Sequence, residues 1–187
     1  MALLPIRICG DPVLHSPAKP VHTIDSGVTD LVHDMTETMR EAPGVGLAAP
    51  QVGVALRLFV YHWVDGEGVT HEGEAINPTL WITPVPAVEA TEDDEEGCLS
   101  FPGERFALTR AARARLIATR LDGSNAEVDA TGWLARIFQH EYDHLDGVLY
   151  VDRLRGAHRK AALKARRRHE WGVPGLEWLP GRDHPEG

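Results

Sequence analysis

The chain has 187 residues, of which 43% are hydrophobic and 25% are charged, and its formal net charge is −9. These values are typical of a single soluble domain, and no apolar run approaches the roughly 18 residues that a membrane-spanning helix requires. Cys9 and Cys98 are too few for a disulfide framework, so we expect a reducing, cytoplasmic location. Pro5 interrupts the short apolar start, which carries no basic segment, so a secretory signal is not expected.

The first half of the chain is expected to contain an irregular arm, one helix and several strands. Residues 6–24 are rich in proline, which favours an extended, irregular conformation. Asp25 or Ser26 is a suitable N-cap for a helix that continues to about Glu41. Six acidic side chains within residues 89–96 predict an exposed loop or sheet edge. A strand is expected at residues 56–61, a strand end that runs into a turn at 75–78, and an extended segment with three breaks at 81–88.

The second half is expected to combine strands with two helices. Thr131 is a suitable N-cap for a helix that continues through Leu145 and stops at Gly147. A second helix is expected over residues 153–170, followed by an irregular tail. Strands are expected at residues 106–109 and 114–119, with a hairpin turn at 121–124. Strands followed by helices indicate an α+β fold, in which antiparallel β-sheets pack around the helix that begins after Thr131.

No linker divides the chain, so we expect residues 1–155 to form the main body of one domain and 156–187 an extension of it. The extension contains most of a strongly basic segment. Eight Lys and Arg residues and no acidic residue lie between Arg153 and Arg168, which leaves −17 for the rest of the chain. Such a segment either contacts a polyanion or forms a solvated helix face, and the sequence leaves both readings open.

The most informative motif is His140-Glu141-Tyr142-Asp143-His144. Positions i and i+4 of a helix share one face, so His140 and His144 can bind the same metal ion. Glu141 lies beside that face and can accept a proton from an activated water. This is the arrangement of the H-E-x-x-H metal hydrolases.

A catalytic site of this kind needs a third protein ligand. The extended motif with a downstream histidine does not fit, because Tyr150 stands at that position. Upstream, the thiolate of Cys98 would complete a His-His-Cys set and leave the fourth position open to water. The alternative for Cys98 is a small buried thiol, which is also the expectation for Cys9. The neighbouring Gly97 and Ser100 favour a tight loop over a core strand.

Residues 44–53 form a second segment of interest because they are rich in small side chains. The segment lacks the Gly-Lys-Ser/Thr of a phosphate-binding loop. Its glycines would let a substrate backbone approach closely, and the Gln51 amide can donate a hydrogen bond to a developing oxyanion.

Three segments together are similar to a known family. In order and spacing, Gly44-x-Gly46-x-Ala48-Ala49-x-Gln51, Glu96-Gly97-Cys98-Leu99-Ser100 and Gln139-His140-Glu141-x-Asp143-His144 resemble the signature motifs of bacterial peptide deformylases. The likeness spans approximately residues 6–154, and residues 171–176 resemble the extension of actinobacterial members. It implies antiparallel strands around the motif helix. It also implies hydrolytic removal of the formyl group from the N-terminal formylmethionine of newly made polypeptides, with release of formate.

The resemblance implies a metal site and its chemistry. Cys98, His140 and His144 would hold Fe(II), and the same ligands also accept zinc, nickel or cobalt. Glu141 would transfer protons during hydrolysis.

An oxyanion that develops on the formyl group would be met by the Gln51 side chain, the Leu99 backbone N–H and the metal. The side chain of Leu99 would then be structural.

The resemblance also places the substrate and a partner. The backbones of Val45, Gly46 and Gly97 would pair with the peptide as an added β-strand. Arg105 either lies at the carboxyl side of the peptide or is a solvated strand residue. Arg136 falls near the methionine pocket, where its stem would line the wall and its head would reach water.

The basic segment from Arg153 to Arg168 would dock on ribosomal RNA near the exit tunnel, through phosphates and without reading a base sequence. No membrane partner is expected.

Two other functions share parts of this pattern. An H-E-x-x-H endopeptidase would need a downstream ligand and would keep its metal without Cys98. A non-enzymatic Cys-His-His module would need a fourth protein ligand and would leave Glu141 without a task. Neither needs a hydrogen-bond donor at Gln51, which favours the deformylase reading.

Overall fold

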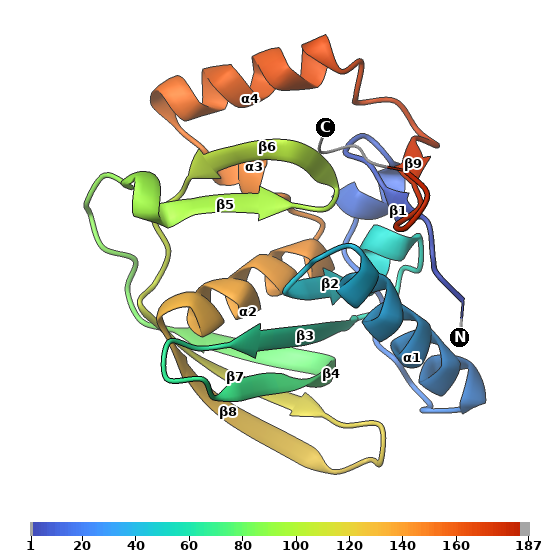
Figure 1. The fold of residues 1–187 in the computed structure, drawn as a ribbon. Helices are drawn as coiled ribbons and strands as arrows, with labels where there is room; N and C mark the ends of the chain where they lie inside the picture. Colours follow the sequence, from blue (N-terminus) through green and yellow to red (C-terminus); the bar gives the residue numbers. More distant parts are fainter. Residues whose placement is uncertain (1, 184–187) are drawn as a thin grey trace.

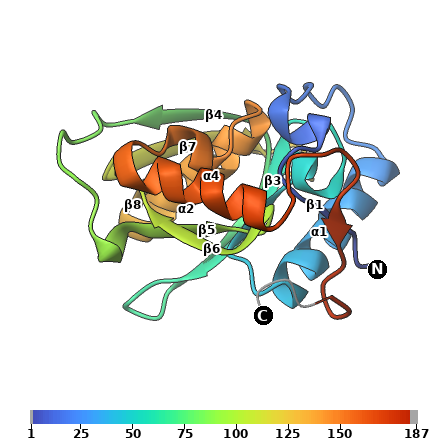
Figure 2. The ribbon, with the colours of Figure 1, turned by 90° about the horizontal axis from the view of Figure 1, so that it is seen from above.

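The computed structural model describes residues 2–183, which form three layers (Figure 1). Helix α2 (Gly132–Leu145) lies between a five-stranded sheet and a two-stranded hairpin of β5 (Glu95–Cys98) and β6 (Phe101–Ala107). Helix α4 (Gly156–Arg168) runs across the far side of the hairpin (Figure 2). All strand pairs are antiparallel. The predicted α+β fold around the motif helix is therefore confirmed.

The remaining elements complete the layers. The large sheet has the order β2-β3-β4-β7-β8. Its strands are β2 (Gly46–Ala48), β3 (Leu58–Val64), β4 (Thr70–Ile82), β7 (Arg113–Thr119) and β8 (Asn125–Thr131). The short elements and first helix are β1 (Ile6–Arg7), η1 (Pro12–His15), α1 (Ser26–Glu41), η2 (Ala49–Val52), η3 (Glu92–Asp94), α3 (Tyr150–Arg153) and β9 (Glu177–Trp178). No helix in the described part of the chain combines the length and apolarity needed to cross a bilayer.

The two long helices begin where the sequence predicts. Asp25 caps α1, since its carboxylate accepts a hydrogen bond of 3.0 Å from the Val28 N–H. Thr131 occupies the N-cap position of α2, although its side chain makes no capping hydrogen bond. Gly147 follows α2 with φ of +75°, and a Cβ there would lie 2.7 Å from the Ser16 nitrogen. A side chain at this stop would therefore collide with the N-terminal arm.

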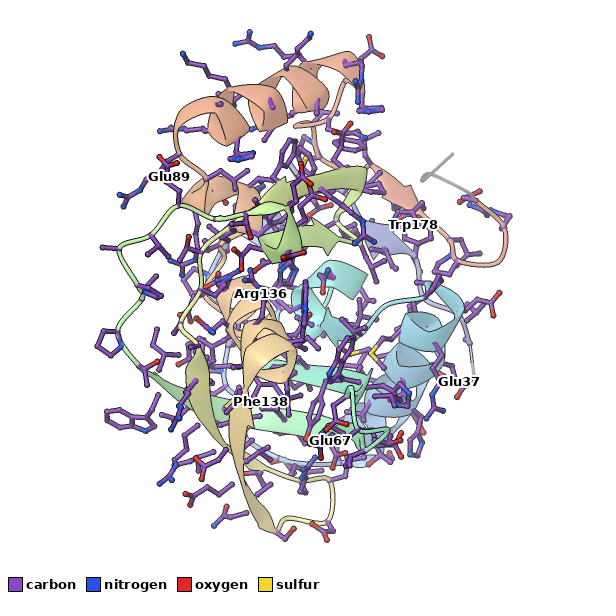
Figure 3. The ribbon with its side chains drawn as sticks, turned by 60° about the vertical axis from the view of Figure 1, so that its left-hand side comes forward. Glu37, Glu67, Glu89, Arg136, Phe138 and Trp178 are labelled. Atoms are coloured by element: carbon purple, nitrogen blue, oxygen red, sulfur yellow. The ribbon has the colours of Figure 1, made fainter. Side chains whose placement is uncertain are left out.

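Helix α2 is buried on two sides with different chemistry. Toward the sheet, Phe138 is fully buried and meets the Tyr61 ring edge-on, with ring centroids 5.0 Å apart. Arg136 lies on the opposite side of the helix, facing the β5–β6 hairpin (Figure 3). Only the side of α2 that faces the sheet is apolar, so its other side can carry polar side chains toward the hairpin.

The predicted strand end at residues 75–78 lies instead inside β4, which is a correction. The pairing of β4 with β7 shifts register between Ile76 and Thr79, and Asn77 adopts φ of +49°. Its side-chain amide bonds both the N–H and the C=O of Val21, each at 2.8 Å. Asparagine tolerates the left-handed region, so a sequence typical of a turn forms a β-bulge here.

The acidic segment 89–96 is only partly the exposed loop that was predicted. Glu95 and Glu96 belong to β5, and Glu96 is 3% exposed. Burial of this carboxylate is possible because three cationic or hydrogen-bonding side chains surround it. They are Arg110, Arg136 and His140.

The C-terminal segment also differs from the prediction. The helix expected over residues 153–170 is present as α4, but it begins only at Gly156, because Leu154 and Arg155 are extended and separate it from the short α3. Leu154 is buried in the core, so tertiary packing overrides helical continuity. The tail was predicted to be irregular, yet β9 pairs with β1. Residues 184–187 of the predicted extension lie outside the described residues.

A buried ionic cluster joins the hairpin to α2. The Arg110 guanidinium donates to both carboxylate oxygens of Glu96, at 2.8 and 2.9 Å, and to Asp143 at 2.6 Å. Arg153 donates to the same Asp143 from α3. All three side chains of the central triad are less than 8% exposed. The triad therefore links three segments that are distant in sequence.

We expect Arg110→Leu to lower the free energy of unfolding by about 3 kcal/mol, because it leaves two buried carboxylates without their shared cation. Urea denaturation measures the change. Arg115→Leu is the matched control, since Arg115 forms an exposed bidentate pair with Asp129 and its removal should have no measurable effect. Equal stabilities for the two variants would contradict the assignment.

Candidate metal centre and active site

Three potential metal ligands converge between α2 and the end of β5. The ligand atoms of Cys98, His140 and His144 all lie within 4.8 Å of one another. The Cys98 sulfur is 3.3 Å from Nε2 of His144. Helical spacing brings the two imidazoles together, with ring centroids 4.9 Å apart. The structure thus brings together the ligand set that the sequence predicts.

The orientation of His140 is set by Glu96. Its Nδ1 lies 3.1 Å from the Glu96 carboxylate, so Nε2 is left to face Cys98. A carboxylate behind a ligating histidine fixes the ring and raises its basicity. Burial opposes ionisation of Glu96, yet the Arg110 and His140 hydrogen bonds hold the pKa of this carboxyl below its usual range. Sequence reasoning missed Glu96, although its place two residues before Cys98 was a usable signal.

Gln51 reaches the cluster from the small-residue loop. Its Oε1 accepts a hydrogen bond of 2.8 Å from the Ala48 N–H, which orients the amide. The Nε2 group therefore faces Ser100 Oγ at 3.3 Å and the Cys98 sulfur at 3.7 Å. Gln51 is 1% exposed. A fixed N–H donor beside the cluster is the arrangement that oxyanion stabilisation requires.

Two buried polar atoms have no partner within the described residues, and both belong to this site. They are Oε2 of Glu141 and Nδ1 of His144. Burial raises the pKa of Glu141 to about 7. Unpaired buried atoms are costly unless a ligand binds beside them. The converging sulfur and nitrogen atoms and the unpaired Glu141 oxygen together fit a divalent cation with an adjacent water.

The cluster opens into a cavity of about 620 Å³. Its walls include Val45 and Gly46 from the small-residue loop, Gly97 and Leu99 beside Cys98, and Arg105 from β6. The structure thus brings every predicted substrate residue to one cavity.

Gly46 has a steric role at this cavity. A Cβ there would lie 2.3 Å from Oε1 of Glu141, so no larger residue fits beside this carboxylate.

Arg136 differs from the prediction. Its head is held by protein acceptors rather than left in water: the side chain is 11% exposed, and Nη1 donates to Glu96 at 2.9 Å and to the Leu108 carbonyl at 2.6 Å. Nη2 donates to Asp94 at 2.7 Å. The guanidinium also lies over the Trp133 ring, 5.2 Å from its centroid. The carboxylates of the acidic segment thus neutralise an arginine in the cavity wall, which sequence spacing could not reveal.

The rival functions fit the site less well. Within residues 2–183, no fourth Cys, His, Asp or Glu joins the three-residue cluster. A closed structural site would need such a ligand, and an endopeptidase of the H-E-x-x-H type would need one downstream.

Comparisons with known proteins agree with the site. Residues 3–160 match the family model described as polypeptide deformylase. A peptide deformylase from Mycobacterium sp. (strain JLS) is 49% identical over 98% of this chain and 97% of its own. One from Tropheryma whipplei (strain TW08/27) is 49% identical over 95% and 94%. The crystal structure of peptide deformylase from Thermus thermophilus superposes with a TM-score of 0.74, with 42% identity over 89% of this chain and 94% of that one. The chain therefore belongs to the peptide deformylase family of metal-dependent hydrolases, which remove the formyl group from the N-terminal formylmethionine of newly made polypeptides.

Proposed function

We propose that this chain carries out deformylation in the cavity beside Cys98, with Fe(II) held in the cell by Cys98, His140 and His144. The observation that carries the proposal is the convergence of these three ligand atoms beside an unpaired carboxylate oxygen. A thiolate with two imidazoles also accepts zinc, nickel or cobalt, so the ion in purified protein depends on supply. When bound, the ion supplies Lewis-acid activation of water and of the formyl oxygen.

Glu141 moves the proton in the proposed reaction. Its carboxylate accepts a proton from the attacking water and then delivers it to the departing α-amine, which needs one to leave. One oxygen of this carboxylate has no partner within the described residues, so it can accept the proton of the attacking water. Burial against Gly46 keeps bulk water away from the carboxylate.

Gln51 and Leu99 stabilise the negative oxygen that develops on the formyl group. The Gln51 amide is already oriented by the Ala48 N–H, so little reorganisation accompanies the reaction. The Leu99 contribution is its backbone N–H, in the turn that follows Cys98.

The peptide binds as an added strand between two open edges. Strand β2, which contains Gly46, is at the edge of the large sheet, and β5, which contains Gly97, pairs only with β6 among the described strands. The backbones of Gly46 and Gly97 therefore pair with an extended peptide, whatever its sequence. Val45 contributes its N–H, since its carbonyl already accepts the His62 N–H at 3.0 Å. Arg105 has its stem 3.6 Å from the position of a Cβ on Gly97 and contacts the carboxyl side of the peptide.

The basic segment between Arg153 and Arg168 docks on ribosomal RNA near the tunnel exit, in the cytoplasm where formylated chains emerge. Several of its cations are exposed and form no ion pair within residues 2–183, among them Arg159, Lys160 and Lys164. Free cations on one helix fit the phosphate backbone. In this proposal residues 1–155 carry the catalysis and 156–187 form the docking extension.

We expect Glu141→Gln to lower formate release from a formyl-Met peptide by at least about 10²-fold, because the amide can neither accept nor return the proton. The assay is run anaerobically with iron-loaded protein. The metal content should stay at the intact level, since Glu141 is not a ligand. If the intact, iron-loaded protein releases no formate, the proposed function is wrong.

We expect Cys98→Ala to lose its bound metal, because two imidazoles alone hold a divalent ion far less tightly than the full set. Metal analysis after gel filtration measures the loss. Cys9→Ala is the matched control: Cys9 is also buried, and its pKa is raised to about 12 by burial, but it lies outside the cluster. Retention of metal by Cys98→Ala would favour an endopeptidase-type site.

We expect simultaneous Arg159→Ala, Lys160→Ala and Lys164→Ala to weaken ribosome binding and to reduce its salt dependence, with the log–log slope falling by about 2. Cosedimentation at several salt concentrations measures both. Peptide deformylation should not change, because no residue of α4 lines the cavity in the described part of the chain. A pair of changes on β7, Arg113→Ala with Arg115→Ala, is the control and should leave binding intact. Binding that does not depend on salt would remove the docking proposal.

A further inference from the structure

The turn between β5 and β6 lacks the residues that usually stabilise such a turn. Cys98 pairs with Phe101, so Leu99 and Ser100 alone connect the strands. Two-residue hairpin turns normally need positive φ at one or both positions, which favours glycine or asparagine. Neither Leu99 nor Ser100 has a positive φ. The conformation of this turn therefore depends on partners outside the hairpin.

Those partners come from the two ends of the described chain. The indole N–H of Trp178 donates to the Leu99 carbonyl at 2.9 Å. The Cys9 N–H donates to the Ser100 carbonyl, also at 2.9 Å. Trp178 is 7% exposed, and β9 holds it beside the hairpin by pairing with Ile6 of β1 (Figure 3). The carbonyls of both turn residues are thus fixed by donors outside the hairpin.

The Trp178 hydrogen bond acts on the least constrained part of the turn. The Leu99 carbonyl and the Ser100 N–H belong to the central peptide. Type I and type II turns differ mainly in a rotation of this peptide that reverses its C=O and N–H directions. A donor fixed on the carbonyl favours one orientation. The Leu99 N–H belongs to the preceding peptide, which the Leu99 Cα joins to the central one. Fixing the central peptide therefore also restricts the direction of the Leu99 N–H.

We propose that Trp178 is a positioning residue for deformylation: its indole N–H holds the Leu99–Ser100 peptide so that the Leu99 N–H is kept ready for the substrate oxygen. The inference rests on the proposed role of Leu99 as an oxyanion donor. Trp178 does not line the cavity in the described part of the chain, so it acts through Leu99. The C-terminal strand is thereby part of the catalytic apparatus as well as of the core.

The test is Trp178→Phe, which keeps a buried aromatic ring and removes the N–H donor; the ring volume that is also lost is matched in the control below. Loss of one hydrogen bond of about 1 kcal/mol should lower kcat by about 5-fold to 10-fold. KM for a formyl-Met peptide should stay within about twofold, because the lost interaction concerns the transition state. The metal content should not change.

Trp171→Phe is the matched control in the same segment. The Trp171 ring packs edge-on against Phe101, with centroids 4.8 Å apart, and its indole makes no hydrogen bond to the turn within residues 2–183. A purely structural role for the tail predicts similar losses for both variants. The positioning role predicts a loss of kcat in Trp178→Phe alone. Unchanged kcat in Trp178→Phe, or equal losses in both variants, would overturn it.

Hydrogen exchange separates this inference from the proposed function. Amides of residues 98–101 should exchange about 5-fold to 10-fold faster in Trp178→Phe than in Trp171→Phe, since local opening becomes easier. An inactive intact protein would end the proposed function and the catalytic role of Trp178 with it, whatever the exchange rates. An active intact protein whose turn exchanges equally in both variants would end the positioning role alone.

Discussion

The carboxylate of Glu96 is the point at which the two halves of the metal centre are joined. It accepts hydrogen bonds from Arg110, Arg136 and His140 and is itself 3% exposed. Its own strand carries Cys98, and His140 belongs to α2, so one buried anion sets the separation between thiol and imidazole. A carboxylate so enclosed is tolerated only when its partners are all present. The hydrogen-bond network around Glu96 is therefore needed both to position the metal ligands and to keep the fold stable.

The chemistry was easier to predict from the sequence than its surroundings. Short-range rules sufficed for α2, because Thr131, the His140–His144 spacing and Gly147 each act within a few residues. These rules failed where contacts with residues distant in the sequence determine the local conformation. No residue near Asn77 in the sequence indicates that its side chain will bond to Val21. This distant contact accompanies a β-bulge where the sequence predicts a strand end.

The same limit explains the errors around the acidic segment and the tail. Six acids in eight residues predict solvent exposure, and only the fold reveals that Arg110 and Arg136 converge on Glu96. Likewise, the pairing of β9 with β1 joins residues about 170 positions apart, which no local pattern encodes. The three motifs could be recognised only in combination. Their order and spacing match a family in which they meet at one site, and no single motif predicts that meeting.

The pairing of the first and last strands has a consequence for the order of synthesis. Chains emerge from their N-terminus, so Ile6 cannot pair with Trp178 until about 170 further residues have been made. The helix and sheet can assemble earlier, because their contacts involve residues made before α4. During translation a nascent molecule therefore passes through a stage with its ligands present and the Leu99 turn unsupported. With Trp178 in its proposed positioning role, the full rate of deformylation would be reached only after β9 has paired with β1.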